Sequence, residues 1–466
     1  MFSAYLEGKR QKLKKLVEIL GKDYKYASVL ATDVKSLRYM ANRAAAQVTD
    51  GQDCERGFVV KLSNGGAFSE YSFDVLPDDL NAFASEIKSS LAPVRGLTAP
   101  EVKTAPVDET ELKEDFLRNS DLEKYSAGEL LSFAGKIKDG VLSADENIVN
   151  AVCLITTYEV SKMFISAKRE LTQNYAWVNG IMVAFYQGEE RLAEAREVAY
   201  ADNLSDVLEK MPGLVEKLAK KAANLSKAKP ITPGVFDVIT DPSISGLIAH
   251  EAFGHGVEMD QFVKDRAVAK EYVGKYVASP IVSMRDGAGS ALSAASYFFD
   301  DDGVLAHDTQ IIKDGILVSG LCDLVSSRQL GVEPTGNGRR QSFKNKAYTR
   351  MTNTFFEAGK DKLEDMIKSV KHGYMLFETN NGMEDPKNWA IQCVCEYGVE
   401  IVDGKLTDTY VSPVVMSGYV PDLLKSISMI SDGLEVIGAG MCGKGYKEWV
   451  RVSDGGPALK ARVKLS

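Results

Sequence analysis

The segment that decides the fold is GVFDVITDPSISGLIAHEAFGHGVEMD, residues 234–260. Its first seven residues are apolar and rich in β-branched side chains, which is typical of a short buried strand. The Asp-Pro-Ser sequence at 241–243 then favours a helix start, because Asp caps the first turn and Pro is tolerated there. The sequence therefore predicts a strand that leads directly into a helix carrying His250, Glu251 and His255.

The two histidines are five residues apart, one more than in the H-E-x-x-H pattern that binds zinc on a regular helix. Five residues turn about 500°, so a regular helix would point the second imidazole about 140° away from the first. A π-type turn would bring both rings to one side. Gly254 and Gly256 flank His255 and ease such an irregularity. The pattern indicates a metal site; the alternative is two partly buried histidines that hydrogen-bond in a core.

Glu251 directly follows the first histidine, where a general base must lie to take a proton from an attacking water. Its alternative interpretation is an exposed helix carboxylate. A catalytic zinc usually has three protein ligands, so a third must come from elsewhere. The residues themselves leave it open among several candidates: Glu258, Asp260, His307, His372, Cys393, Cys395 and Cys442.

The sequence around each candidate gives some guidance. The two carboxylates lie near a helix end, where such groups are usually solvated, and His307 and His372 fit surface or loop positions. Cys393 and Cys395 are at strand spacing and fit a core strand. Cys442 lies in GAGMCGKG, which we interpret as a glycine-rich loop where a thiolate could approach an ion.

The rest of the chain predicts an α+β fold in two domains, with a mixed α/β domain over 1–230 and a strand-rich, hairpin-rich C-terminal domain over 231–466 that carries the metal-site helix. Periodic apolar residues predict several helices, among them 119–140, 205–227 and 421–430. The SNGG sequence after a β-rich run predicts a hairpin turn. Prolines and weak periodicity predict a loop or linker near 93–118.

Composition excludes several function classes. The chain has 466 residues and a formal net charge of −9, and no dense Lys/Arg block indicates a nucleic-acid partner. The lysine-rich runs at 9–15 and 217–221 fit solvated helix faces. No apolar run is long enough for a membrane span, and the N-terminal segment lacks signal-peptide features. The six scattered cysteines predict reduced thiols and a cytoplasmic location.

Two other motifs are weaker. Gly438, Gly443 and Lys444 have the spacing of a phosphate-binding loop, but Gly445 replaces the Ser/Thr that would hold magnesium, so we do not predict nucleotide binding. FDDDG at 299–303 lacks the spacing of a calcium loop and predicts a hairpin turn.

Taken together, the motifs of the second half resemble the TldD/PmbA family, on the TldD side. The matching segments appear in the family's order: HEAFGH (250–255), FDDDG (299–303), TGNGRR (335–340), RMTNTFFEAG (350–359) and GMCGKG (440–445). The N-terminal third matches poorly. After CGKG the usual Gln is replaced by Tyr446.

The resemblance implies a zinc metallopeptidase. It makes His250, His255 and Cys442 the ligands of one Zn²⁺ per catalytic chain, and Glu251 the catalytic base. It implies short or unfolded peptides, including leader-type segments, as substrates. These would be hydrolysed in an enclosed site within a homodimer, or a heterodimer with a family-related subunit. The alternative is a non-catalytic peptide-binding partner subunit of such a peptidase.

Overall fold

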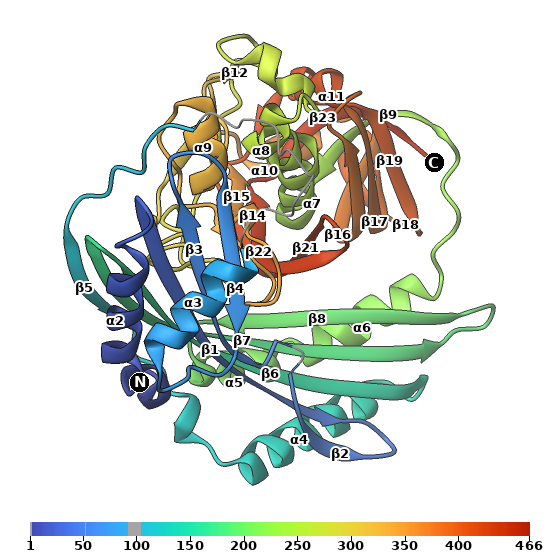
Figure 1. Cartoon of the computed structure of the whole chain (residues 1–466). Helices are drawn as coiled ribbons and strands as arrows, with labels where there is room; N and C mark the ends of the chain where they lie inside the picture. The colour runs from blue at the N-terminus through green and yellow to red at the C-terminus, as the bar shows by residue number, and fades with distance from the viewer. Residues whose placement is uncertain (1, 52, 92–103) are drawn as a thin grey trace.

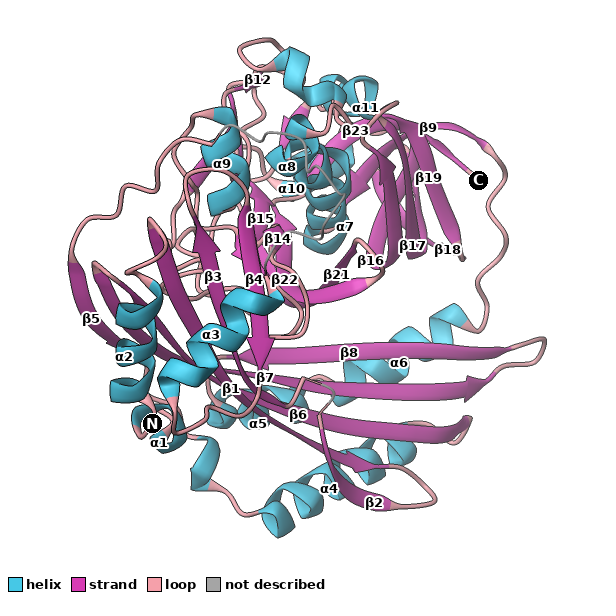
Figure 2. Ribbon diagram, viewed as in Figure 1, coloured by secondary structure: helices cyan, strands magenta, loops and turns pink. Residues whose placement is uncertain are grey.

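The structure is a computed structural model that describes residues 2–51, 53–91 and 104–466. It confirms the α+β class and the two strand-rich domains, which pack one above the other in Figure 1. Within the described residues, the N-terminal domain has one eight-stranded sheet. The C-terminal domain has a six-stranded sheet, a seven-stranded sheet and a short two-stranded ribbon. Figure 2 shows that strands dominate both domains.

The N-terminal sheet has the order β4-β3-β1-β6-β7-β5, with β2 on β1 and β8 on β7. Its strands are β1 Tyr26–Ala41, β2 Ala46–Asp50, β3 Glu55–Ser63, β4 Phe68–Phe73, β5 Leu112–Leu117, β6 Ile148–Ser166, β7 Arg169–Gln187 and β8 Leu192–Ala201. The predicted SNGG hairpin joins β3 to β4. The sequence did not predict β8, whose register follows β7 over ten residue pairs.

The predicted loop or linker near 93–118 needs correction. Residues 92–103 lie outside the described residues, so that part stays untested. Residues 112–117 form β5, which pairs in parallel with β7 along six positions. The segment has no turn signals of its own, and its extended shape is set by the edge of β7 that it covers.

Helices cover one face of this sheet, as Figure 1 shows for α4, α5 and α6 beneath the long strands. The helices are α1 Ala4–Glu7, α2 Arg10–Leu20, α3 Leu80–Ser90, α4 Ala127–Ala144, α5 Leu204–Gly213 and α6 Val215–Leu225, with a short 3₁₀ turn η1 Leu122–Lys124. The helix predicted over 205–227 is thus two helices. Pro212, which lacks an amide hydrogen, stands at the last turn of the first.

Alternate side chains of β1 point to opposite faces of the N-terminal sheet. Val29 and Ala31 pack under α2 and α3, whereas Leu30 packs with Phe299 of the C-terminal domain. One prediction is wrong on the helix face: Lys221 is buried, because it forms ion pairs with Glu197 at 2.5 Å and with Glu378.

The opposite face of the sheet meets the C-terminal domain through buried charges. We call Lys61, Glu70, Asp301, Asp302 and Arg340 the interdomain cluster. Lys61 pairs with Glu70 at 3.0 Å and with Asp302. Arg340 pairs with Glu70 at 3.0 Å. The predicted FDDDG turn is present, because Phe299 bridges to Leu305, but its carboxylates are buried in this contact.

The C-terminal domain has two larger sheets. The six-stranded sheet has the order β12-β11-β10-β15-β22-β21, and the other has the order β16-β9-β23-β19-β17-β18 with β20 on β23. Because β16 also pairs with β17, five strands of the second sheet close into a ring. The strands are β9 Gly234–Thr240, β10 Met284–Asp286, β11 Thr309–Lys313, β12 Ile316–Leu317, β13 Gly338–Arg339, β14 Tyr348–Thr349, β15 Asn353–Phe356, β16 His372–Asp385, β17 Ala390–Val402, β18 Lys405–Val411, β19 Val414–Tyr419, β20 Met429–Ile430, β21 Glu435–Lys444, β22 Glu448–Gly456 and β23 Leu459–Leu465.

Its helices are α7 Pro242–Ile248, α8 Met259–Val263, α9 Leu324–Leu330, α10 Leu363–Lys368 and α11 Val420–Ser426. The 3₁₀ turns are η3 His255–Val257 and η4 Val268–Tyr272, and the π-helical turn is η2 Ala249–Gly254. The helix predicted over 421–430 is therefore shorter than expected. Residues 429–430 instead pair with β23, which satisfies their backbone groups in the sheet.

Helix α7 is placed by the strand before it and the sheet beside it. As predicted, β9 leads directly into α7, and the Asp241 side chain accepts a hydrogen bond from the Ile244 amide at 2.8 Å. A Cβ at Gly246 would lie 2.3 Å from the Gly455 amide nitrogen of β22. Glycine at position 246 thus lets the helix lie directly on β22, the strand that pairs with β21.

Candidate metal centre

The helix carrying the two histidines has the irregularity that their spacing predicts. α7 continues into the π-helical turn η2, Ala249–Gly254, and His255 follows it immediately. Within this turn the i→i+5 spacing places both imidazoles on one side. The ring centroids of His250 and His255 lie 5.1 Å apart. A Cβ at Gly254 would lie 1.9 Å from Met351 Sδ, so this glycine is also required for packing.

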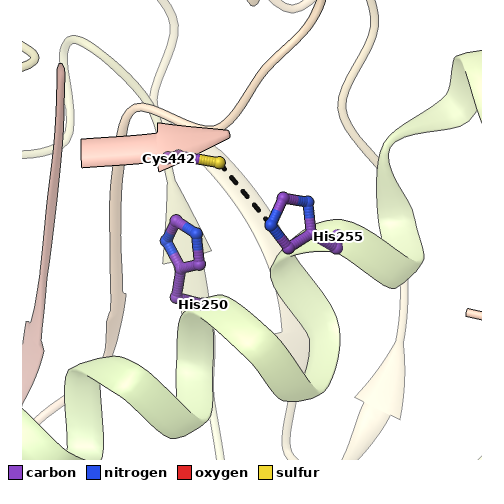
Figure 3. A group of neighbouring side chains, drawn as sticks. All are labelled: His250, His255 and Cys442. Atoms are coloured by element: carbon purple, nitrogen blue, oxygen red, sulfur yellow. Dashed lines mark hydrogen bonds between the residues drawn. The ribbon is translucent and has the colours of Figure 1, made fainter. Parts of the chain in front are cut away.

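Cys442 joins the two histidines from a distant part of the chain. The nearest ligand atoms of His250, His255 and Cys442 all lie within 4.8 Å of one another. His255 Nε2 lies 3.5 Å from Cys442 Sγ, and Figure 3 shows all three side chains converging. One buried imidazole, one partly buried imidazole and one buried thiol form a donor set that fits zinc, which favours nitrogen and sulfur ligands.

The predicted glycine-rich loop around Cys442 is wrong, because the segment is strand β21. Cys442 pairs with Val450 of β22 in an antiparallel register. Its glycines serve close packing: a Cβ at Gly438 would lie 2.3 Å from the Trp177 ring. The Trp177 indole donates a hydrogen bond to the Gly438 carbonyl at 2.8 Å, which ties β21 to the N-terminal sheet.

Four of the remaining candidates lie outside the cluster. Cys393 and Cys395 are buried in the core on β17, as expected from their spacing. His372 is exposed and contacts Glu400 at 3.2 Å, and His307 is exposed in a loop. None of the four belongs to the group of metal-binding atoms found among the described residues.

Glu258 and Asp260 are buried, contrary to the expectation that they are solvated. Glu258 Oε2 lies 3.1 Å from His255 Nδ1, the ring nitrogen opposite the one facing Cys442. The Lys444 ammonium donates to Glu258 at 3.0 Å and to Asp260 at 2.7 Å. A carboxylate on the far nitrogen fixes the tautomer and orientation of a metal-binding histidine.

Sequence reasoning missed this role of Lys444. We noted the lysine only as part of an incomplete phosphate-loop pattern. Once β21 is recognised as a strand, Lys444 and Cys442 share a face because side chains alternate. That spacing is the signal that could have placed the ammonium beside the metal centre.

His250 has a different environment. Its Nδ1 is buried and has no hydrogen-bond partner among the described residues, although Asp454 Oδ2 of β22 lies 3.9 Å away. Burial raises the pKa of Asp454 to about 6, although the nearby His250 opposes this. Asp454 is therefore a second carboxylate beside the ligands, and nothing in its sequence context indicated that role.

The three side chains are electrostatically coupled. Burial lowers the pKa of His250, but the adjacent Cys442 thiolate reverses this and raises it to about 9. Burial raises the pKa of Cys442, but the two histidines outweigh it and hold that pKa well below its usual range. The cluster thus stabilises a thiolate, the form in which cysteine binds metal ions.

Glu251 is not the exposed helix carboxylate of the alternative interpretation, since its side chain is buried. A Cβ at Gly382 of β16 would lie 2.5 Å from Glu251 Cγ, so the strand packs directly against it. On the same strand, both oxygens of Glu384 are buried without a hydrogen-bond partner among the described residues. Burial raises the pKa of Glu384 to about 9.

The TGNGRR and RMTNTFFEAG segments support the centre through a buried carboxylate. Asp286 accepts hydrogen bonds from the Asn337 amide at 2.9 Å and from the Thr352 hydroxyl at 2.8 Å. The buried Arg350 guanidinium donates to the Cys442 carbonyl at 2.5 Å. These segments hold the backbone of β21 in place.

Comparison with known proteins gives a consistent picture for the C-terminal half. Residues 233–463 match the PmbA/TldA metallopeptidase C-terminal domain. A protein named "Metalloprotease" from Methanothermobacter thermautotrophicus is 31% identical over 249 residues, 53% of this chain and 54% of the relative. A "Zinc metalloprotease TldD homolog" from Saccharolobus solfataricus is 28% identical over 282 residues, 58% of this chain and 62% of the relative.

The fold extends the likeness to the whole chain. The crystal structure of TldE from Thermococcus kodakarensis superposes with a TM-score of 0.74 over 97% of this chain and 99% of that one, at 16% sequence identity. The chain spans about half the length of the curated relatives it matches. From the domain match, the named relatives and the shared fold, we conclude that the chain belongs to the TldD/PmbA family.

Proposed function

We propose that this chain is the catalytic subunit of a zinc-dependent metallopeptidase. The observation that carries the proposal is the convergence of His250, His255 and Cys442 within 4.8 Å, with Glu251 buried beside them. The relatives named above as metalloproteases support it. We propose 230/231 as the domain boundary, with residues 231–466 as the catalytic domain.

His250, His255 and Cys442 would hold the ion, and Glu258 would orient His255. Zinc, when bound, supplies a Lewis acid that polarises a peptide carbonyl and makes a nearby water more acidic. Glu251 takes a proton from the attacking water as its oxygen bonds to the carbonyl carbon. Glu251 then gives that proton to the leaving nitrogen as the C–N bond breaks.

We propose short or unfolded peptides, including leader-type segments, as the substrates. A centre buried between a helix and a sheet is closed to compact proteins, whereas an extended peptide can reach it along a strand edge. The TldE structure neighbour supports a family-related partner, in a homodimer or a heterodimer that encloses the site. We expect the cytoplasm as the compartment. No helix in the described part of the chain is long and apolar enough to cross a membrane.

The second candidate is a peptide-binding partner subunit without catalytic activity. The complete ligand set favours the catalytic function, because a subunit that only binds peptides has no need of three converging ligands and a buried carboxylate. The two functions differ in whether peptide bonds are hydrolysed.

The test is a joint measurement of zinc content and hydrolysis. Purified wild type is expected to hold about one zinc per chain and to cleave unstructured peptides. Glu251→Gln should keep the zinc and lose about 10²–10⁴-fold in kcat. Glu400→Gln, which removes the carboxylate charge beside exposed His372, is the matched control and should change neither. Zinc-loaded wild type that binds peptides without cleaving them would establish the binding-subunit alternative.

A further inference from the structure

A cavity lies between the N-terminal sheet and the β21–β22 hairpin, on the side of the hairpin away from the histidines. Residues of both domains line it, including Tyr158 and Trp177 from the N-terminal domain and Met441, Trp449 and Arg451 from the hairpin. We propose that this cavity receives an aromatic side chain of the peptide substrate. The proposal rests on the proposed peptidase function and adds a specificity site to it.

The walls suit an aromatic ring. The Arg451 guanidinium lies 3.2 Å from the centroid of the Tyr158 ring, and the Arg339 guanidinium lies 5.6 Å from that of Tyr297. Flat guanidinium groups and aromatic faces both stack favourably against another ring. The cavity thus offers planar surfaces from both domains.

The charges at the cavity already have partners. Arg451 pairs with Asp53 at 2.9 Å. Arg339 donates to the carbonyls of Met351 and Arg451, each at 2.6 Å. Because Arg451 is paired with a carboxylate and Arg339 is hydrogen-bonded to two carbonyls, an acidic side chain would have to compete with existing contacts, whereas an uncharged aromatic ring would not.

Strand geometry links the cavity to the metal centre. Cys442 faces the histidines and Met441, the preceding residue, lines the cavity, as expected because consecutive side chains of a strand point to opposite faces. Strand β21 is at the end of its sheet among the described residues. A peptide extended along this edge would place one side chain beside the metal centre and the next in the cavity.

Two large apolar side chains at the cavity are only half covered. Met441 is 41% exposed and Trp449 is 47% exposed. A bound aromatic ring would remove this surface from water, which favours binding. Tyr446 is on the same hairpin and is 95% exposed, but it does not line the cavity, so it provides a matched control.

The first test uses hydrolysis. Alanine octapeptides that each carry one phenylalanine, together with the all-alanine parent, are assayed for kcat/KM with the zinc-loaded protein. Wild type is expected to prefer phenylalanine at one position by about 10–200-fold. Trp449→Ala should reduce this ratio to within about threefold, Trp449→Phe should retain most of it, and Tyr446→Ala should leave it unchanged. An equal ratio in wild type and Trp449→Ala, or an equal loss in Tyr446→Ala, would overturn the proposal.

The second test does not depend on hydrolysis. Two of the three tryptophans of the chain, Trp177 and Trp449, line the cavity, so intrinsic fluorescence reports its occupancy. The preferred phenylalanine peptide, or the whole phenylalanine set if none is cleaved, is titrated into the metal-free chain. A larger fluorescence change than with the parent, kept in part through Trp177 in Trp449→Phe and lost in Trp449→Ala, supports the cavity even if the peptidase function fails. Cleavage without any phenylalanine preference in either assay retains the function and rejects the cavity.

Discussion

The interdomain cluster and the metal centre both contain buried charged side chains, and they differ in how those charges are matched. In the interdomain cluster each carboxylate has a cation of the same chain: Glu70 pairs with Lys61 and Arg340, Asp302 with Lys61, and Asp301 with Lys162. Such a group gains nothing from a further ion. It fixes how the two domains meet.

The metal centre is matched less completely. His250 Nδ1 and both oxygens of Glu384 are buried without a hydrogen-bond partner among the described residues. Leaving buried polar groups unpaired costs stability, so such groups mark places where a protein keeps a site for something else. The comparison teaches that burial and charge alone do not identify a site: the carboxylates of the interdomain cluster are paired with cations, whereas the Glu384 carboxylate beside the metal centre is not.

The largest expected effect is on the interdomain cluster. Lys61→Met leaves the fully buried Asp302 carboxylate without its cation, which is expected to lower the free energy of unfolding by about 3–5 kcal/mol. Urea unfolding at pH 7 measures this. Zinc affinity should stay unchanged, and a parallel loss of zinc would show that the two clusters are coupled.

At the metal centre, the expected loss is in zinc affinity. Structural zinc sites have binding free energies of about 10–16 kcal/mol, so loss of one ligand in Cys442→Ala is expected to weaken zinc binding by about 10²–10³-fold. Competition with a chromophoric chelator measures the affinity. Cys393→Ala, which removes a buried cysteine outside the centre, is the control and should keep the affinity. Equal affinities in the two variants would remove Cys442 from the ligand set.

A third prediction concerns Gly254, which packs against Met351 at the π-helical turn. Gly254→Ala would place a Cβ 1.9 Å from Met351 Sδ, and such overpacking is expected to cost about 1–3 kcal/mol of unfolding free energy. The double variant with Met351→Ala should recover part of this cost. A double-mutant cycle by thermal unfolding measures the coupling; independent effects would mean that the backbone, and not Met351, requires glycine.

The smallest effect concerns pH. Partial burial raises the pKa of Glu70, but Lys61 and Arg340 outweigh this and lower that pKa to about 2. Because this folded-state pKa lies below the unfolded value of 4.5, the carboxylate stabilises the fold above about pH 4.5 and loses that contribution as pH falls toward 2. Glu70→Gln should therefore cost about 1–2 kcal/mol at pH 7, and the difference from wild type should shrink in urea unfolding at pH 3.

Local patterns predicted the parts of the site that depend on local geometry. The spacing of His250 and His255, taken together with the predicted metal site, indicated a π-type turn, and the turn is present. The strand character of the Cys442 segment was not predictable in this way. Its glycines suggested a loop, but one of them, Gly438, is required by the Trp177 ring, 261 positions away in the chain. Glu384 likewise lies among polar residues of β16 that carry no local signal.

For the fold as well, local patterns predicted only the elements that depend on local sequence. Apolar periodicity located most of the helices and the strands with turn signals, but β5 and β8 exist because they share the edge of β7 that β6 leaves free, β5 along residues 169–174 and β8 along residues 178–187. The sequence FDDDG predicted only a hairpin turn, whereas two of its carboxylates pair with Lys61 and Lys162 of the other domain. In these cases the structure depends on contacts between segments that are far apart in the chain. Such contacts cannot be predicted from a single sequence.

The placement of β23 has a consequence for when the protein becomes active. β23 lies between β9 and β19, and its Leu459 amide donates to Thr240 at the end of β9, 219 positions away. Contacts between such distant residues form slowly, because a long stretch of chain must first be ordered. The histidines follow β9 and Cys442 precedes β23, so the ligands meet only when this pairing closes. An enzyme with the proposed function would therefore gain its peptidase activity only after its own chain has folded far enough to pair β23 with β9.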